Sequence, residues 1–89
     1  MKAKSGFVLR DVVGEKILMP VGDNITKFNG TVLLNTVSAF VWEKLQEPAS
    51  KEELLQAILD KFEIDEATAS HDLAGLLDKF TELGILEEE

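Results

Sequence analysis

The segment TVLLN (residues 31–35) constrains the fold more than any other part of the chain. Its first four residues predict a short strand. A strand in a small antiparallel sheet normally alternates apolar with polar residues, because one of its faces meets water. This strand lacks that alternation, and Asn35 follows it directly as a good N-cap for a helix. We therefore expect a strand that leads straight into a helix and is covered on both faces, by helices on one side and by Trp42 and a hairpin on the other.

That hairpin is predicted upstream. GFVLRDV (residues 6–12) and KILMPV (residues 16–21) are rich in Val, Ile, Leu and Phe, and the glycine of VGE between them allows a tight reversal. GDNITKFNG (residues 22–30) reads as a longer polar connection with turn residues at both ends. With residues 31–34, these segments predict an N-terminal three-stranded antiparallel sheet.

Three helices are predicted after the sheet, at about residues 36–46, 50–62 and 65–83. The second begins with the capping box formed by Ser50 and Glu53, the third begins at Asp65, and Gly84 ends it. The last apolar residues, Ile85 and Leu86, are expected to form a short extended tail.

The short links between these helices favour a helix-turn-helix that the sheet covers on one side. We therefore expect residues 1–89 to form a single α+β domain, with the three-stranded sheet followed by a three-helix winged helix-turn-helix.

The composition gives little support to catalysis. The chain has no cysteine, no tyrosine and one histidine, and it lacks a glycine-rich phosphate loop and a nucleophile elbow. His71 falls on the side of the third helix away from its apolar stripe, which favours a surface residue over a catalytic one. Trp42 could be a ligand platform, but cover between sheet and helix is the favoured interpretation. We expect no enzyme activity, no metal and no cofactor.

The charge is divided unevenly along the chain. Residues 1–35 carry five basic and three acidic side chains, whereas residues 36–89 carry four basic and fourteen acidic ones. The third helix has five acids against the single Lys79, and this field would repel the phosphates that a DNA-binding helix must approach. No segment has the roughly 20 apolar residues that span a bilayer, and the N-terminus does not resemble a signal peptide. We expect a cytoplasmic protein that binds neither nucleic acid nor membrane.

The third strand points to another kind of partner. In a meander it lies at an edge, where unpaired N–H and C=O groups can accept an extended peptide, and no lysine or proline blunts that edge. Small side chains along one flank of the third helix, at Ala67, Ser70, Ala74 and Thr81, would leave a groove if this flank faces the edge. The same pattern also suits close helix packing or a flank exposed to solvent. The open edge would accept a second copy of the chain as well.

Several motifs occur together in a characteristic order. VLLN leads into a helix (residues 32–35), VWEKL follows (residues 41–45), and LDKFTELGILEE closes the chain (residues 77–88). Over residues 7–87 the sequence resembles the PqqD family, also called recognition elements for ribosomally made, post-translationally modified peptides (RiPPs). Its connection at residues 21–30 is longer than the short connection found after the second strand in members from pyrroloquinoline quinone pathways. The product of the pathway could therefore also be a lasso peptide or a thioether-bridged peptide.

The resemblance implies a non-catalytic peptide chaperone. Such a protein binds the leader segment of a precursor peptide as a strand added to its third strand, and presents the precursor to a modifying enzyme, often a radical S-adenosylmethionine enzyme. Carried over by position, the groove would be formed by Thr31, Val32, Leu33 and Leu34 on the strand and by Ala67, Ser70, His71, Ala74, Leu77 and Asp78 on the third helix. The alternative is an acidic winged-helix domain that binds proteins or acts in transcription through its helices.

Overall fold

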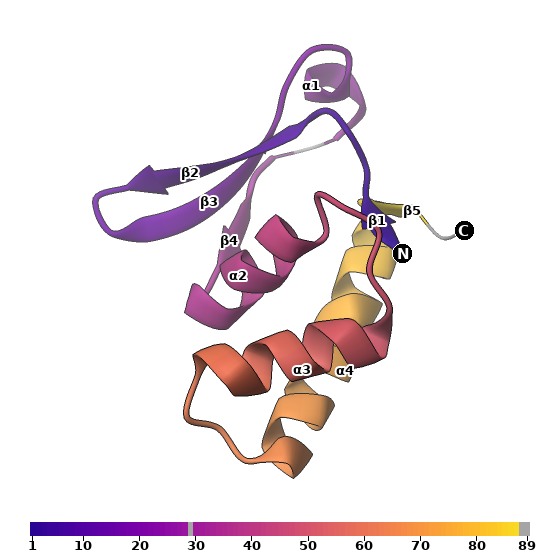
Figure 1. Cartoon of the computed structure of the whole chain (residues 1–89). Coiled ribbons are helices and arrows are strands. Elements are labelled where there is room, and N and C mark those ends of the chain that lie inside the picture. Colours follow the sequence, from indigo (N-terminus) through magenta and orange to yellow (C-terminus); the bar gives the residue numbers. More distant parts are fainter. Residues whose placement is uncertain (29, 88–89) are drawn as a thin grey trace.

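Two antiparallel sheets and four helices make up the α+β fold, in a computed structural model that describes residues 1–28 and 30–87. Figure 1 shows the hairpin of β2 and β3 extending to one side, with α2, α3 and α4 gathered on the other. In chain order the elements are β1 (Lys2–Ala3), β2 (Phe7–Val12), β3 (Glu15–Pro20), α1 (Asn24–Lys27), β4 (Val32–Leu34), α2 (Thr36–Lys44), α3 (Lys51–Lys61), α4 (Glu66–Leu83) and β5 (Leu86–Glu87).

The larger sheet has the strand order β2-β3-β4, as the sequence predicts for residues 6–34. In its register Ile17 lies opposite Leu33, and Leu18 lies opposite Val32. The reversal between β2 and β3 is made by Val13 and Gly14, whose φ angles of 52° and 82° are both positive. Two consecutive residues of this kind form the mirror-image turn that matches the twist of a hairpin.

A single three-stranded sheet is an incomplete prediction, because β1 and β5 form a second, two-stranded sheet that joins the two ends of the chain. The expected tail at Ile85 and Leu86 is therefore paired. The carbonyl of Ile85 accepts a hydrogen bond of 2.9 Å from the N–H of Lys4, and Leu86 lies opposite Ala3. Pairing supplies partners for backbone groups that a free tail would leave to water.

The connection after β3 is also more ordered than expected, since it contains the short helix α1. The side-chain amide of Asn24 donates to the carbonyl oxygens of Ser5 and Gly6, each at 3.2 Å. These hydrogen bonds tie α1 to the segment between β1 and β2, which lies far from it in the sequence. They explain local order in a segment whose polar composition suggested a plain loop.

The helix ends follow the capping residues seen in the sequence. The capping box of Ser50 and Glu53 is present at α3, Asp65 accepts from the N–H of Thr68 at α4, and Gly84 ends α4 with a left-handed φ of 72°. Among the described residues, no helix is both long enough and apolar enough to cross a membrane.

The core lies between the inner face of the larger sheet and the helices. Trp42 is 2% exposed, and its ring contacts those of Phe7 and Phe80 edge-on, at centroid distances of 6.3 and 5.5 Å. It therefore joins β2, α2 and α4 and is a core residue, not a ligand platform. Val32 and Leu34 are buried in the same cluster, at 7% and 5% exposure.

The expected cover on the second face of β4 is absent from the described part of the chain. Leu33 points away from the core and is 60% exposed, because the core cluster that contains Trp42, Val32 and Leu34 lies on the inner face of β4 only. The strand thus has the ordinary in-and-out alternation, with a leucine where a polar residue would usually meet water. The expectation of two covered faces is wrong for the isolated chain.

Candidate functional site

The free edge of β4 forms one side of the candidate site. β4 pairs with β3 on one side only, so part of its backbone hydrogen-bonding capacity faces away from the sheet. Asn35 ends the strand, and its side-chain oxygen Oδ1 accepts a hydrogen bond of 2.8 Å from the backbone N–H of Ser38 in the first turn of α2. The chain therefore turns sharply from the open edge into a helix.

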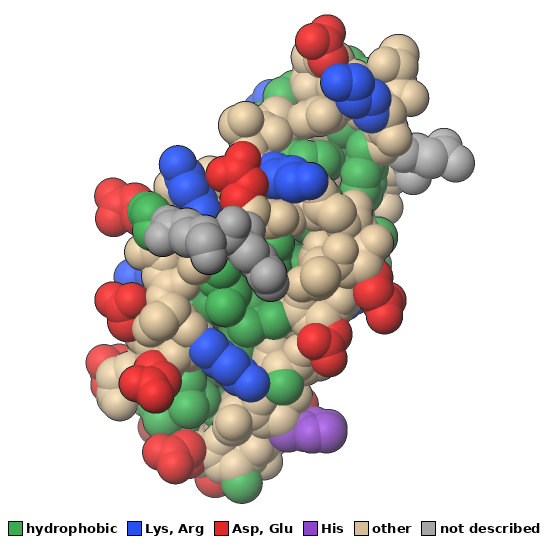
Figure 2. Space-filling view, turned by 90° about the vertical axis from the view of Figure 1, so that its right-hand side faces the viewer, with side chains coloured by type: hydrophobic (Ala, Val, Ile, Leu, Met, Phe, Trp, Pro, Cys, Tyr) green, Lys and Arg blue, Asp and Glu red, His purple; other side chains and the backbone are tan. Residues whose placement is uncertain are grey.

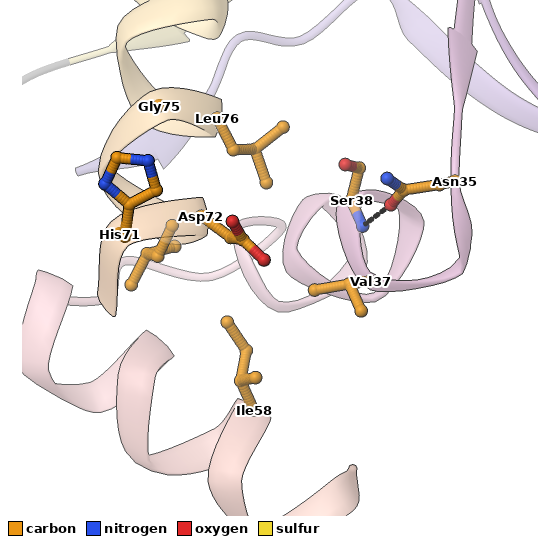
Figure 3. A pocket seen from close by; sticks show the side chains of 9 residues that line it. Asn35, Val37, Ser38, Ile58, His71, Asp72, Gly75 and Leu76 are labelled. Carbon is orange, nitrogen blue, oxygen red and sulfur yellow. Dashed lines mark hydrogen bonds between the residues drawn. The ribbon is translucent and has the colours of Figure 1, made fainter. Parts of the chain in front are cut away.

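A hollow of about 380 Å³ lies at the end of this edge, between α2, α3 and α4. Figure 3 shows Asp72 and Leu76 of α4 lying across the hollow from Asn35 and Ser38, with Val37 and Ile58 below them. The lining is formed by Asn35, Val37, Ser38, Ile58, His71, Asp72, Leu73, Gly75 and Leu76. Polar and aliphatic side chains contribute about equally to this lining, so the hollow offers both hydrogen-bonding and apolar contacts to a guest side chain.

Gly75 widens this hollow from the middle of α4. A Cβ atom at this position would meet nothing within 4 Å, so packing inside the protein does not require a glycine there. Glycine in a helix interior costs about 1 kcal/mol relative to alanine. Its presence therefore points to a need for space at the surface of α4.

A second hollow, of about 430 Å³, lies on the other side of Asn35. It is lined by Gly14, Glu15, Lys16, Leu33, Leu34, Asn35 and Thr36, from the hairpin turn, β4 and the start of α2. Asn35 and the end of β4 thus separate two depressions. The second hollow lies toward the paired side of β4, because Glu15 and Lys16 belong to β3.

The residues expected to form the groove are placed in different surroundings. All three residues of β4 lie at the edge, with Thr31 exposed just before them, and His71 lines the hollow. Elsewhere on α4, Ala67 and Asp78 are exposed, Ser70 and Ala74 are partly buried, and Leu77 is part of the core cluster. Six α4 residues were expected in the groove. Of these, only His71 lines the first hollow together with the end of β4.

The lining of the first hollow contains residues that were not expected in the groove. Asp72, Gly75 and Leu76 lie next to the expected flank around the circumference of α4, and Asn35, Val37 and Ser38 come from the start of α2. Gly75 indicates this part of the groove in the sequence, because a glycine in the middle of a helix lowers the stability of the helix and therefore needs a reason.

The displaced pKa values among the described residues belong to side chains outside the first hollow. Four such groups occur in the described part of the chain, and each has a local cause at an exposed position. A hydrogen bond from Lys16 lowers the pKa of Asp11, and the same contact, at 2.7 Å, raises the pKa of Lys16. Backbone hydrogen bonds from Ser50 and Thr68 lower the pKa of Glu53 and Asp65, respectively.

The described residues contain no group of three or more side chains able to hold a metal ion. Figure 2 shows acidic side chains around the margin of one face, hydrophobic side chains in its middle and the single histidine protruding at its lower edge. Lys and Arg side chains lie among the acidic ones on this face (Figure 2).

These features define an α+β protein with one open sheet edge beside hollows lined by helices. Residues 15–86 match the family model described as coenzyme PQQ synthesis protein D, PqqD. Because the match spans most of the sequence, the chain belongs to the PqqD family. No curated protein sequence matches it significantly.

Two solved structures share this fold. One is TbiB1 in complex with the TbiA(beta) leader peptide, with a TM-score of 0.77 and 24% identity over 100% of this chain and 98% of that chain. The other is a lasso peptide synthetase B1 complexed with the leader peptide, with a TM-score of 0.72 and 17% identity over 98% of this chain and 96% of that one.

Proposed function

We propose that this protein is a peptide chaperone that binds the leader segment of a RiPP precursor and presents the precursor to a modifying enzyme. The observation that carries this proposal is the free edge of β4, which ends at Asn35 between two hollows. Membership of the PqqD family supports it, as do the two similar folds, both determined with leader peptides.

Strand addition fits the physical character of this edge. A leader that pairs with residues 31–34 would gain main-chain hydrogen bonds, while alternate side chains would enter pockets and supply specificity. We place Val37, Asp72, Gly75 and Leu76 in the binding surface, because they line the hollow at the end of the strand. The flank at Ala67, Ser70, His71, Ala74, Leu77 and Asp78 remains part of the proposal as the α4 side of the groove.

The wider assignment follows from the same role. We assign no catalytic activity and no cofactor to the chain, and we place it in the cytoplasm as one domain over residues 1–89, with α2, α3 and α4 as a winged helix-turn-helix. The enzyme partner would be a radical S-adenosylmethionine enzyme in a pyrroloquinoline quinone pathway or another RiPP enzyme. The family description favours the first product, and the similar fold of the lasso peptide synthetase B1 favours a lasso peptide.

A scan of N-methylated leader peptides tests strand addition directly. The probe is the leader of a candidate precursor from the genome that encodes this protein, synthesised with one backbone N–H methylated at a time and titrated by calorimetry. In an added strand, alternate N–H groups face β4, so affinity should fall at every second position and hold at those between. Losses without this period of two, as for a helical peptide docked on α2–α4, would contradict the proposal. Concentration-dependent sedimentation would show whether the edge pairs with a second copy instead.

A further inference from the structure

The large hydrophobic side chains that remain exposed are concentrated in one part of the described chain. They are Val12, Val13, Met19, Val21, Ile25 and Leu33, with exposures from 37% to 97%. All six lie between residues 12 and 33, and none lies on α2, α3 or α4. The part of the chain that carries them also lacks the acidic excess of the helices. Clustered exposed apolar groups of this kind mark interaction sites.

The strand register places several of these residues on the outer face of the larger sheet. Arg10 lies opposite Ile17, and Ile17 lies opposite Leu33, so these three form one row across all three strands. Val8 and Met19 form the neighbouring row. The salt bridge found among the described residues joins Lys16 to Asp11 and leaves Arg10 without an ionic partner there. An arginine within apolar side chains is typical of the energetic centre of an interface.

Val13, at the tip of the same hairpin, supports an external role. Its φ of 52° is unfavourable for a β-branched residue, and a turn of this type prefers asparagine at that position. The side chain is 97% exposed, so no packing within the chain offsets the cost of this backbone conformation. A strained and exposed valine is explained if its partner is another protein.

The size of the face argues against a stable dimer. Six residues of strand span about 20 Å and three strands about 14 Å, so the face covers roughly 300 Å². A stable interface buries about 800 Å² on each partner. Two copies that carry eight negative charges each would also repel one another. One added strand would enlarge the face by about 100 Å². The surface is therefore of a size for a weak, transient partner that gains from that enlargement.

We propose that the outer face of β2, β3 and β4 docks the modifying enzyme, and that the bound leader completes this docking surface. The inference rests on the proposed function, because a leader strand added to β4 would extend the row Arg10–Ile17–Leu33 by one outward side chain. The enzyme surface that fits is apolar with a carboxylate opposite Arg10. Leader and enzyme then bind cooperatively, each raising the affinity of the chain for the other.

The test uses a candidate precursor and its modifying enzyme from the genome that encodes this protein. Arg10→Glu alters the outer face on β2, two strands away from the leader edge. Val13→Asn alters it at the hairpin tip. Lys51→Glu is the matched control, since it makes the same charge change at an exposed position of α3. Calorimetry gives the leader affinity, and surface binding gives the enzyme affinity with and without leader. Circular dichroism checks that each variant is folded.

We expect leader affinity to stay within twofold for all three variants. Enzyme affinity of the leader-bound chain should fall about tenfold or more for Arg10→Glu and should fall for Val13→Asn, with Lys51→Glu at the wild-type value. Unchanged enzyme affinity in Arg10→Glu, an equal loss in Lys51→Glu, or no effect of leader on enzyme affinity would each overturn the inference. The inference would also be overturned if the wild-type chain formed dimers and Arg10→Glu made them dissociate. Failure of the wild-type chain to bind leader would instead refute the proposed function.

Discussion

Asn35 and Ser38 join the open edge of the sheet to the helices through one hydrogen bond, 2.8 Å long, from the Ser38 N–H to the Asn35 side chain. This contact fixes the point at which β4 stops and α2 begins, and both residues line the first hollow. The position of the site thus depends on a helix cap.

Removing that cap should weaken the fold measurably. We expect Asn35→Ala to lower the free energy of unfolding by about 1 kcal/mol, because an N-cap side chain satisfies a backbone N–H that otherwise lacks a partner. Asn35→Ser, which keeps an acceptor at this position, should lose much less. Urea denaturation of both variants measures the difference, and equal losses would show that the cap itself contributes little.

Filling the first hollow should separate stability from binding. We expect Gly75→Ala and Gly75→Leu to raise the free energy of unfolding by about 0.5–1 kcal/mol, since both residues favour a helix and a Cβ atom there meets nothing. Leader affinity should fall slightly for alanine and about tenfold for leucine, which occupies the space. Gln56→Leu, on the exposed side of α3, is the control for added apolar surface. Full leader affinity in Gly75→Leu would remove the first hollow from the site.

Trp42 should be essential to a single folding unit. Because its ring contacts both Phe7 of β2 and Phe80 of α4, we expect Trp42→Ala to cost about 3–5 kcal/mol and to destabilise sheet and helices together. Val13→Ala, at a fully exposed tip, serves as the control for a truncation outside the core. Separate unfolding transitions for the sheet and the helices would contradict the single domain proposed for residues 1–89.

Acid should loosen the starts of α3 and α4. The backbone hydrogen bonds that lower the pKa of Glu53 and Asp65 stabilise the ionised, folded form. Their contribution is therefore complete above the ordinary carboxyl pKa of about 4 and is lost as the pH falls through the lower folded value. We expect the urea midpoint to be steady near neutrality and to fall below about pH 4.

The double variant Glu53→Gln, Asp65→Asn keeps hydrogen-bonding side chains that do not titrate. Its urea midpoint should fall less steeply with acid than that of the wild-type chain. An identical fall in both proteins would assign the acid sensitivity to other carboxylates, such as Asp11.

Local signals in the sequence were sufficient for the secondary structure that has strong caps and turns. The start of α3 is marked by Ser50 with Glu53, the start of α4 by Asp65, and its end by Gly84. Each acts through its own side chain or the lack of one, so the ends of α3 and α4 were predicted within one residue. The small sheet of β1 and β5 could not be predicted in this way. Two residues at each end of the chain carry no periodic pattern, and only the packed core brings them together.

The site shows the same division between local and distant information. TVLLN identified the strand edge and its endpoint, because both depend on neighbouring residues. The facing side of α4 depends on how that helix is rotated, and a shift of one or two positions exchanges Ala74 for Gly75 and Leu76 at the hollow. The exposure of Leu33 was missed for a related reason, since a pattern that requires cover does not say whether the cover comes from the same chain.

Hydrogen exchange at β4 tests the central claim most directly. The protein is measured alone, with the leader of the candidate precursor, and with a scrambled peptide of the same composition. We predict that the leader slows exchange at the β4 amides that face the free edge, which alternate along Val32, Leu33 and Leu34 with those that face β3, while the scrambled peptide does not. Protection confined to the amides of α2, α3 and α4, with β4 unchanged, would contradict strand addition.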